Sequence, residues 1–203
     1  MQLPVDPASV KGFLDPAEGE RLHDLALEVA PLGPCLEIGS YCGKSTLYLG
    51  AALKRAGGQL FAVDHHRGSE EHQLGEEYHD PELYDSEAGR MDSLPQFRRT
   101  LYRAGLEDVV VPVVGSTAQV SRFWRIPLSL VFIDGGHSLE AALTDYRQWS
   151  GHLLKGGYLA IHDIFPDPEE GGQAPYTIYQ HAVQSGLYRV EGMTRTLGVL
   201  RRL

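Results

Sequence analysis

The chain has 203 residues, of which 42% are hydrophobic and 22% are charged. This length suits one domain with a substantial core, and no apolar run approaches the roughly 18–20 residues that a membrane span needs. A formal net charge of −9 excludes the strongly basic surface of a typical nucleic-acid binder. We therefore expect a single domain over residues 1–203, with neither a membrane nor a nucleic acid as partner.

The N-terminal residues have neither the basic region nor the apolar segment of a secretory signal, so we expect a cytoplasmic protein. The only cysteines are Cys35 and Cys42, too few for a disulfide scaffold, and we interpret them as buried thiols.

The first half of the chain alternates between helical and strand patterns. Pro16 directly after Asp15 is typical of a helix start. The pattern predicts a helix over 15–30, a strand over 35–39, a helix over 45–55 and a strand over 59–64. Residues 1–33 form an N-terminal helical extension in this scheme.

An acidic insert follows over residues 65–92. It holds nine acidic and two basic residues, a net charge of −7, which leaves about −2 for the rest of the chain. Because this charge leaves few attractive contacts to hold the segment on the body, we expect a mobile lid. Residues 165–175, rich in proline and glycine, are a second candidate lid.

The second half continues the alternation. The pattern predicts helices over 93–104, 117–123, 138–154 and 176–184, strands over 109–114, 128–134 and 157–164, and a terminal hairpin of 187–192 and 196–201. Pro112 argues against a central position for its strand, since proline cannot donate to the hydrogen-bond ladder. Helix 138–154 should pack through Leu139, Ala142, Leu143 and Tyr146.

Alternating helices and near-continuous apolar strands predict an α/β fold, a Rossmann-like, doubly wound and mostly parallel sheet covered on both faces. Ligands of such sheets bind at the carboxyl ends of the strands. Four of the five relevant strand ends carry a carboxylate, and packing a core does not require that; the carboxylates are Glu37, Asp64, Asp134 and Asp163.

A glycine-rich turn spans residues 36–45 (LEIGSYCGKS). Gly39 lets the chain turn tightly after the strand, and Gly43 lets a helix N-terminus approach a ligand. Tyr41 and Lys44 stand where a dinucleotide fingerprint needs its second and third glycines. Glu37 would repel a pyrophosphate but suits a cationic amino-acid group; the alternative is a plain turn in which Glu37 helps to cap the helix.

Asp64 ends the next strand, 21 residues after Gly43. A carboxylate at this position can accept hydrogen bonds from both ribose hydroxyls of a nucleoside. The alternative is an aspartate that caps the following segment.

Two further strand ends carry candidate chemistry. In Asp134-Gly135-Gly136-His137, the histidine lies at the mouth of the crevice as a general base or, alternatively, as a helix cap. The pair His162-Asp163 could join Asp134 in a site for Mg²⁺ or Mn²⁺. The alternative is that Asp163 bonds the backbone and His162 packs.

Together these segments resemble the class I S-adenosylmethionine (SAM)-dependent methyltransferases, from about residue 35 to the C-terminus. The resemblance is carried by LEIGSYCGKS at 36–45, FAVD at 61–64, VFIDGGHS at 131–138 and LLKGGYLAIHDI at 153–164. It is strongest for small-molecule O-methyltransferases, including the antibiotic-sugar and catechol-type branches. It implies a seven-stranded sheet whose C-terminal hairpin contributes an antiparallel strand.

The resemblance also implies roles for single residues. Glu37 and Gly39 approach the methionine part of SAM, Asp64 binds the ribose, Ser116 lies near the adenine, and Asp134 faces both cofactor and substrate. The remaining implied cofactor residues are Ser40, Tyr41, Gly43, Ser45 and His65. In the metal-dependent branches the cation ligands match Asp134, His162 and Asp163, although His162 replaces the carboxylate usual in the sugar-modifying branch. That branch also has a base matching His137.

The sequence thus predicts a methyltransferase that transfers a methyl group from SAM to a small-molecule acceptor, at a hydroxyl oxygen, with a divalent cation as a candidate second cofactor. Two other functions stay open at this stage: an NAD(P)-dependent oxidoreductase, and a non-catalytic SAM-binding module. Neither the acceptor nor the oligomeric state follows from the sequence, so a homo-oligomer stays open too.

Overall fold

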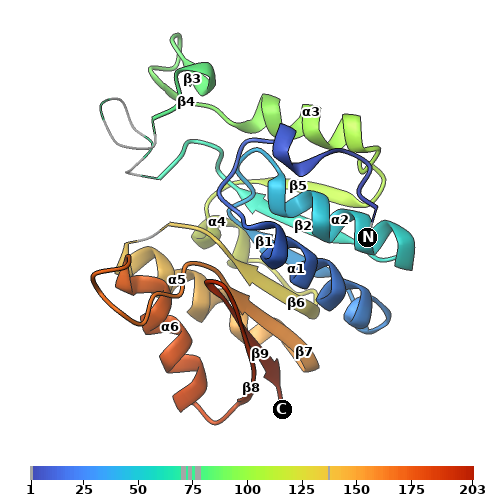
Figure 1. The fold of residues 1–203 in the computed structure, drawn as a ribbon, viewed down its shortest axis with the longest axis vertical. Coiled ribbons are helices and arrows are strands. Elements are labelled where there is room, and N and C mark those ends of the chain that lie inside the picture. Colours follow the sequence, from blue (N-terminus) through green and yellow to red (C-terminus); the bar gives the residue numbers. More distant parts are fainter. Residues whose placement is uncertain (1, 70–71, 73–74, 76–78, 137) are drawn as a thin grey trace.

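A computed structural model of the protein describes residues 2–69, 72, 75, 79–136 and 138–203. A seven-stranded sheet runs through its centre with helices on both faces (Figure 1). The strand order is β5-β2-β1-β6-β7-β9-β8. The predicted Rossmann-like, mostly parallel α/β fold is therefore confirmed.

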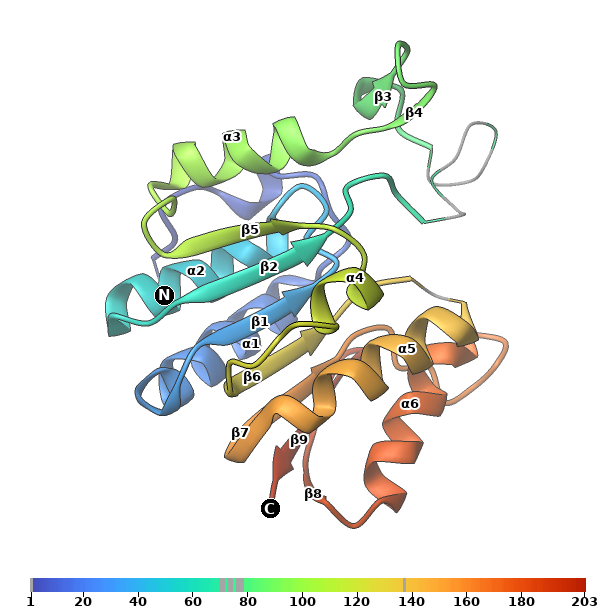
Figure 2. The ribbon, with the colours of Figure 1, turned by 180° about the vertical axis from the view of Figure 1, so that it is seen from behind.

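The strands of this sheet are β1 (Cys35–Ile38), β2 (Leu60–Asp64), β5 (Val110–Val114), β6 (Leu128–Ile133), β7 (Leu153–Ile161), β8 (Tyr188–Thr194) and β9 (Leu197–Arg202). Strands β5, β2, β1, β6 and β7 pair in parallel, whereas β9 pairs antiparallel with both β7 and β8. Figure 2 shows the parallel strands of this sheet pointing toward the side from which β3 and β4 project. The carboxyl ends of the parallel strands thus share one edge.

Helices cover both faces of the sheet, as the two opposite views show (Figures 1 and 2). One face carries α1 (Pro16–Val29), α2 (Lys44–Ala56) and α3 (Leu94–Ala104), and the other carries α4 (Thr117–Ser121), α5 (Leu139–Trp149) and α6 (Gln173–Gln184). Within β6, Leu130 and Phe132 pack into the first layer, and Val131 and Ile133 pack into the second. This alternation explains why the strand is apolar throughout.

Local signals set several helix boundaries where we predicted them. Asp15 and Glu18 form a capping box around Pro16 at the start of α1. Gly57 and Gly105 cap the C-termini of α2 and α3, both in the left-handed conformation. In the described part of the chain, no helix combines the length and the apolar character that a bilayer crossing requires.

The predicted helix over 138–154 is too long. Helix α5 ends at Trp149, a short 3-10 turn follows, and Leu153 already pairs with Leu128 at the start of β7. Leu139, predicted on the packed face, is half exposed. At the other end, β7 stops at Ile161, so the predicted strand over 157–164 is wrong beyond that residue.

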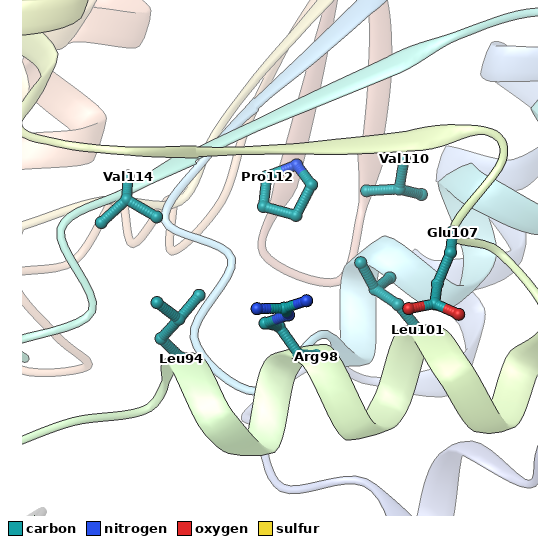
Figure 3. Close-up of a pocket in the computed structure, with 7 residues that line it drawn as sticks. All are labelled: Leu94, Arg98, Leu101, Glu107, Val110, Pro112 and Val114. Carbon is teal, nitrogen blue, oxygen red and sulfur yellow. The ribbon is translucent and has the colours of Figure 1, made fainter.

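Strand β5 lies at the edge of the sheet, which confirms the inference drawn from Pro112. Between β5 and α3 lies a groove of about 360 Å³, shown in Figure 3. Apart from Arg98 and Glu107, its lining is apolar: Leu94, Leu101, Val110, Pro112 and Val114. The groove lies along the edge strand, apart from the carboxyl ends of β1, β6 and β7.

The acidic insert contains a small hairpin of β3 (Tyr84–Asp85) and β4 (Arg90–Met91). Lys11 pairs with Asp80 and, at 2.7 Å, with Glu82, while Leu83 and Met91 are buried in the core. The premise that few attractive contacts hold the insert is therefore wrong for its second half. The lid role itself stays a prediction.

Candidate active site

A cleft of about 1070 Å³ opens at the carboxyl ends of the parallel strands. Eight of the ten predicted cofactor-binding residues line it: Gly39, Ser40, Tyr41, Ser45, Asp64, His65, Ser116 and Asp134. His162 and Asp163, predicted as cation ligands, line it too. His137 lies outside the described residues, but its neighbours Gly136 and Ser138 line the cleft.

The turn after β1 is built from unusual backbone conformations. Gly39, Tyr41 and Gly43 have φ angles of 84°, 45° and 94°. A positive φ is uncommon for a bulky residue such as Tyr41, and strain of this kind clusters at functional sites. A Cβ atom at Gly39 would lie 2.0 Å from the carbonyl oxygen of Asp134, so the turns after β1 and β6 are in backbone contact.

Asp64 organises the same turn from the end of β2. One carboxylate oxygen, Oδ2, accepts the backbone N–H groups of Ser40 at 3.0 Å and Tyr41 at 2.8 Å. The other, Oδ1, accepts the N–H of His66 at 2.7 Å. Asp64 therefore fulfils the capping role and lines the cleft at once.

The hydroxyl group of Ser40 has no hydrogen-bond partner within the part of the chain that the structure describes, although it is buried. A buried hydroxyl without a partner costs free energy, so such groups call for an explanation. Because Ser40 lines the cleft, a polar ligand atom bound there would satisfy it.

Glu37, predicted to approach a ligand, does not line the cleft. It is fully buried, and its two oxygens accept the hydroxyl hydrogens of Ser45 and Thr46, each at 2.5 Å. Burial raises the pKa of its carboxyl to about 8, although the two hydroxyl donors act in the opposite direction. The observed contacts are those of the alternative interpretation, in which Glu37 holds the first turn of α2.

Gly43 does not line the cleft either. A Cβ atom there would lie 3.2 Å from Cγ2 of Thr100 and 3.3 Å from the ring of Phe97. The absence of a side chain therefore lets the start of α2 lie close to α3.

A second buried carboxyl supports the turn after β6. Asp145 of α5 is buried at the cleft wall, and burial raises the pKa of its carboxyl to about 6, against the hydrogen bond with Thr117. A Cβ atom at Gly135 would lie 2.5 Å from its Oδ2. Glycine at 135 thus lets the backbone after Asp134 pass directly over α5.

Asp134, His162 and Asp163 meet at the other side of this turn. One ligand atom from each lies within 4.8 Å of the other two. The Nδ1 atom of His162 is 3.1 Å from Oδ1 of Asp134 and 3.3 Å from Oδ1 of Asp163. Asp163, the second residue after the end of β7, has a left-handed backbone conformation with a φ angle of 56°.

The second ring nitrogen of His162 has a partner that the sequence did not indicate. Its Nε2 lies 2.9 Å from Oε2 of Glu18, a buried residue of α1. Burial alone would lower the pKa of His162, but the carboxylates of Asp134, Asp163 and Glu18 outweigh it and hold that pKa above its ordinary value.

These atoms also fit a divalent cation. Adjacent ligands of an octahedral ion with bonds of about 2.1 Å lie about 3 Å apart, close to the two separations at Nδ1. A histidine that binds a metal through one nitrogen almost always donates the other N–H to a carboxylate or carbonyl, and Glu18 supplies that acceptor.

An N-terminal segment that the sequence did not single out also borders the cleft. Lys11, Gly12 and Phe13 line it, and Lys44 donates to the carbonyl of Gly12 at 2.8 Å. The ring of Phe13 lies 6.2 Å from that of Tyr41. This segment and the acidic insert meet through Lys11.

The charge of the cleft is negative. Among the described residues that line it, the only lysines are Lys11, paired with the insert, and Lys44, bonded to the backbone of Gly12. Six carboxylates line the same space: Asp64, Asp134, Glu140, Asp145, Asp163 and Glu170. Such a field favours neutral or cationic ligands over phosphorylated ones.

Comparison with known proteins gives one family and a set of similar folds. A family model described as a methyltransferase domain matches residues 36–164. Cofactor-bound Rv0187 from MTB is 17% identical to this chain, with a TM-score of 0.68. The alignment covers 96% of this chain and 84% of the Rv0187 chain. The O-methyltransferase NovP is 16% identical with a TM-score of 0.70, covering 92% and 79%. An O-methyltransferase from Bacillus cereus in complex with SAH is 17% identical with a TM-score of 0.63, covering 96% and 86%. At these identities, the likeness establishes the shared fold.

Proposed function

This chain belongs to the methyltransferase-domain family and is a methyltransferase, and from that premise we propose that it transfers the methyl group of SAM to a hydroxyl oxygen of a small molecule. The observation that carries the proposal is the strand-end cleft, which brings the Gly39 turn, Asp64 and Asp134 together. Two neighbours of the same fold add support, because NovP is an O-methyltransferase and the Bacillus cereus O-methyltransferase is in complex with SAH.

The cleft suits SAM better than a dinucleotide. SAM brings a cationic amino-acid end and a ribose, and it carries no phosphate. The cleft offers the unpartnered hydroxyl of Ser40 and the carboxylate of Asp64, whereas a pyrophosphate would meet mainly carboxylates and no free lysine among the described residues. These features speak against the NAD(P)-dependent alternative.

The protein's own task is to orient the acceptor and to remove its proton. Bound SAM supplies an electrophilic methyl group on a sulfonium. As the acceptor oxygen forms its new bond to carbon and the sulfur–carbon bond breaks, His137 takes the hydroxyl proton. Histidine is a common general base near neutral pH.

Asp134, Asp163 and His162 would hold a divalent cation beside the acceptor. A bound cation lowers the pKa of a hydroxyl group that it contacts. Because one donor is an imidazole, the set suits Mn²⁺ better than Mg²⁺, which prefers oxygen ligands and retains its waters.

Calorimetry with the purified protein tests the proposal. We expect SAM and SAH to bind and NADH to leave the heat signal unchanged. Transfer of a radiolabelled methyl group from SAM to one member of a panel of catechols and glycosides would establish catalysis. Binding of SAM without transfer to any hydroxylated acceptor would favour the non-catalytic module instead.

Replacing Asp64 with alanine should weaken SAM binding by about 10–100-fold, since a lost hydrogen bond to a charged group costs about 1.5–3 kcal/mol. Asp108→Ala is the matched control: this exposed aspartate pairs with Lys54, and it does not line the cleft. Isothermal titration of both variants gives the comparison. Equal affinities would remove Asp64 from the SAM site.

Removal of bound cations should abolish most of the methyl transfer. We expect EDTA-treated, desalted protein to regain activity with Mn²⁺ and to a smaller extent with Mg²⁺, because of the imidazole ligand. SAM affinity, measured in parallel, should stay within a few-fold. Transfer at the full rate by the metal-free protein would show that the cation is dispensable.

A further inference from the structure

Glu18 has an unusual position for a glutamate of a helix N-terminus. Only 2% of it is exposed to solvent, although glutamate is rarely buried unless paired. It lies outside residues 36–164, which the family model matches. It contacts the candidate cation site from a different part of the chain.

Both carboxylate oxygens of Glu18 are fully engaged. Oε1 accepts the backbone N–H and the hydroxyl hydrogen of Thr196, each at 2.8 Å. Oε2 accepts the N–H of Asp15 at 3.1 Å and lies 2.9 Å from Nε2 of His162. Four contacts with three residues fix this carboxylate in one orientation.

The fixed carboxylate determines how the ring of His162 presents itself. With Nε2–H donated to Glu18, the opposite nitrogen, Nδ1, faces Asp134 and Asp163. The ring is also held edge-on to Phe132, with centroids 6.3 Å apart. These contacts fix Nε2 on the side of Glu18 and Nδ1 on the side of the two aspartates.

We propose that Glu18 is a positioning residue of the cation site: it keeps the proton of His162 on Nε2 and leaves Nδ1 to bind the ion. The inference rests on the cation site of the proposed function. It adds that α1 and the turn before β9, which supplies Thr196, complete a site whose three ligands follow the ends of β6 and β7. Partners of this kind typically change metal affinity by about 10–100-fold when they are replaced.

Glu18→Gln tests the inference because it keeps the shape of the side chain. Thr196 donates two hydrogen bonds to this side chain, and Asp15 donates one. The amide oxygen of the glutamine should therefore stay on the side of Thr196. The amide N–H₂ group then faces Nε2 of His162. Nε2 must then accept, and the proton moves to Nδ1, where it blocks the ion. Glu28→Gln is the matched control: it is the same change on the same helix, where Glu28 accepts from Tyr158 at 2.9 Å, away from the cleft.

The measurement is Mn²⁺ binding to metal-free protein, followed by electron paramagnetic resonance of the free ion. We expect Glu18→Gln to bind Mn²⁺ about 10–100-fold more weakly than wild type, and Glu28→Gln to bind it normally. Unchanged Mn²⁺ affinity in Glu18→Gln would overturn the inference and leave Glu18 a structural residue. A wild-type protein that binds no Mn²⁺ would overturn it as well.

A second measurement needs no variant at Glu18. In wild-type protein loaded with Zn²⁺, long-range ¹H–¹⁵N NMR should find the proton of His162 on Nε2, with His162→Gln assigning the signal. A proton on Nδ1 would refute the inference. SAM titration of the same samples separates this result from the proposed function, because loss of SAM binding contradicts the methyltransferase site and leaves the Mn²⁺ comparison intact.

Discussion

Among alanine substitutions at the glycines that line the cleft, we expect Gly39→Ala to reduce methyl transfer the most. Its Cβ would lie 2.0 Å from the carbonyl oxygen of Asp134, 2.6 Å from the carbonyl carbon and 3.0 Å from Cα of Gly135. None of these is a flexible side-chain end, so the turns after β1 and β6 must separate. A shift of about 1 Å between reacting groups costs about 100-fold in rate, and we expect at least that loss of methyl transfer.

The same substitution should lower the free energy of unfolding by about 2–6 kcal/mol, from backbone strain together with overpacking. Gly57→Ala separates the two causes. Gly57 has a φ of 72°, close to the 84° of Gly39, but its Cβ would meet nothing within 4 Å. Urea unfolding should show a loss of only about 1–2 kcal/mol for Gly57→Ala. Similar losses in both variants would mean that the contact with Asp134 is unimportant.

Replacing His137 with alanine should reduce turnover by about 10²–10⁴-fold, the usual effect of removing a general base. The proposal rests on its position three residues after Asp134, between the cleft-lining residues Gly136 and Ser138. SAM affinity should stay within a few-fold, because the imidazole acts on the acceptor and not on the cofactor. Single-turnover kinetics and calorimetry measure the two quantities separately.

Two controls make this test specific. His137→Gln keeps a polar side chain of similar reach and should lose turnover as well, whereas the same alanine change at the exposed His181 of α6 should have no effect. If His137→Ala and His137→Gln both kept near-normal turnover, deprotonation would come from the cation alone. An equal loss of SAM affinity would mean that the substitution damaged the cleft.

The parallel sheet and most of the cleft were predictable because they follow from local patterns. Apolar runs mark strands that are buried on both faces, and a parallel sheet brings their carboxyl ends to one edge. Gly39, Asp64, Asp134 and Asp163 could therefore be assigned to one site from their places at strand ends. All four line the observed cleft, and their positions at strand ends were enough to predict this without the directions of their side chains.

Glu37 shows where that argument fails. Its strand-end position is as favourable as that of Asp64, but Ser45 and Thr46 reach back from the first turn of α2 and take both of its oxygens. Whether a strand-end carboxylate meets a ligand or a neighbouring helix depends on side-chain directions that a strand pattern does not contain.

Glu18 shows the opposite failure. With Asp15 three residues before it, Glu18 matches a capping box, and it does accept the N–H of Asp15. From the sequence alone, helix capping is a sufficient explanation for a glutamate at this position. Its contact with His162, 144 residues away, arises only because α1 packs beside the ends of β6 and β7.

The edge strand β5 has a consequence for how the molecule behaves among copies of itself. Leu60 donates its N–H to the carbonyl of Val109, and Gly115 donates to that of Asp64. The odd-numbered residues of β5 therefore face β2, and the even-numbered ones turn their backbone groups outward.

Val110, Pro112 and Val114 are the residues of β5 that face outward, and they offer few free N–H donors to another strand. Val110 already donates its N–H to Leu106, Pro112 has no N–H, and only Val114 is left as a donor. An extended chain that docks on a sheet needs a regular row of such donors. Proline at 112 thus blocks aggregation by strand addition along this edge, beside a groove whose apolar lining would otherwise invite it (Figure 3).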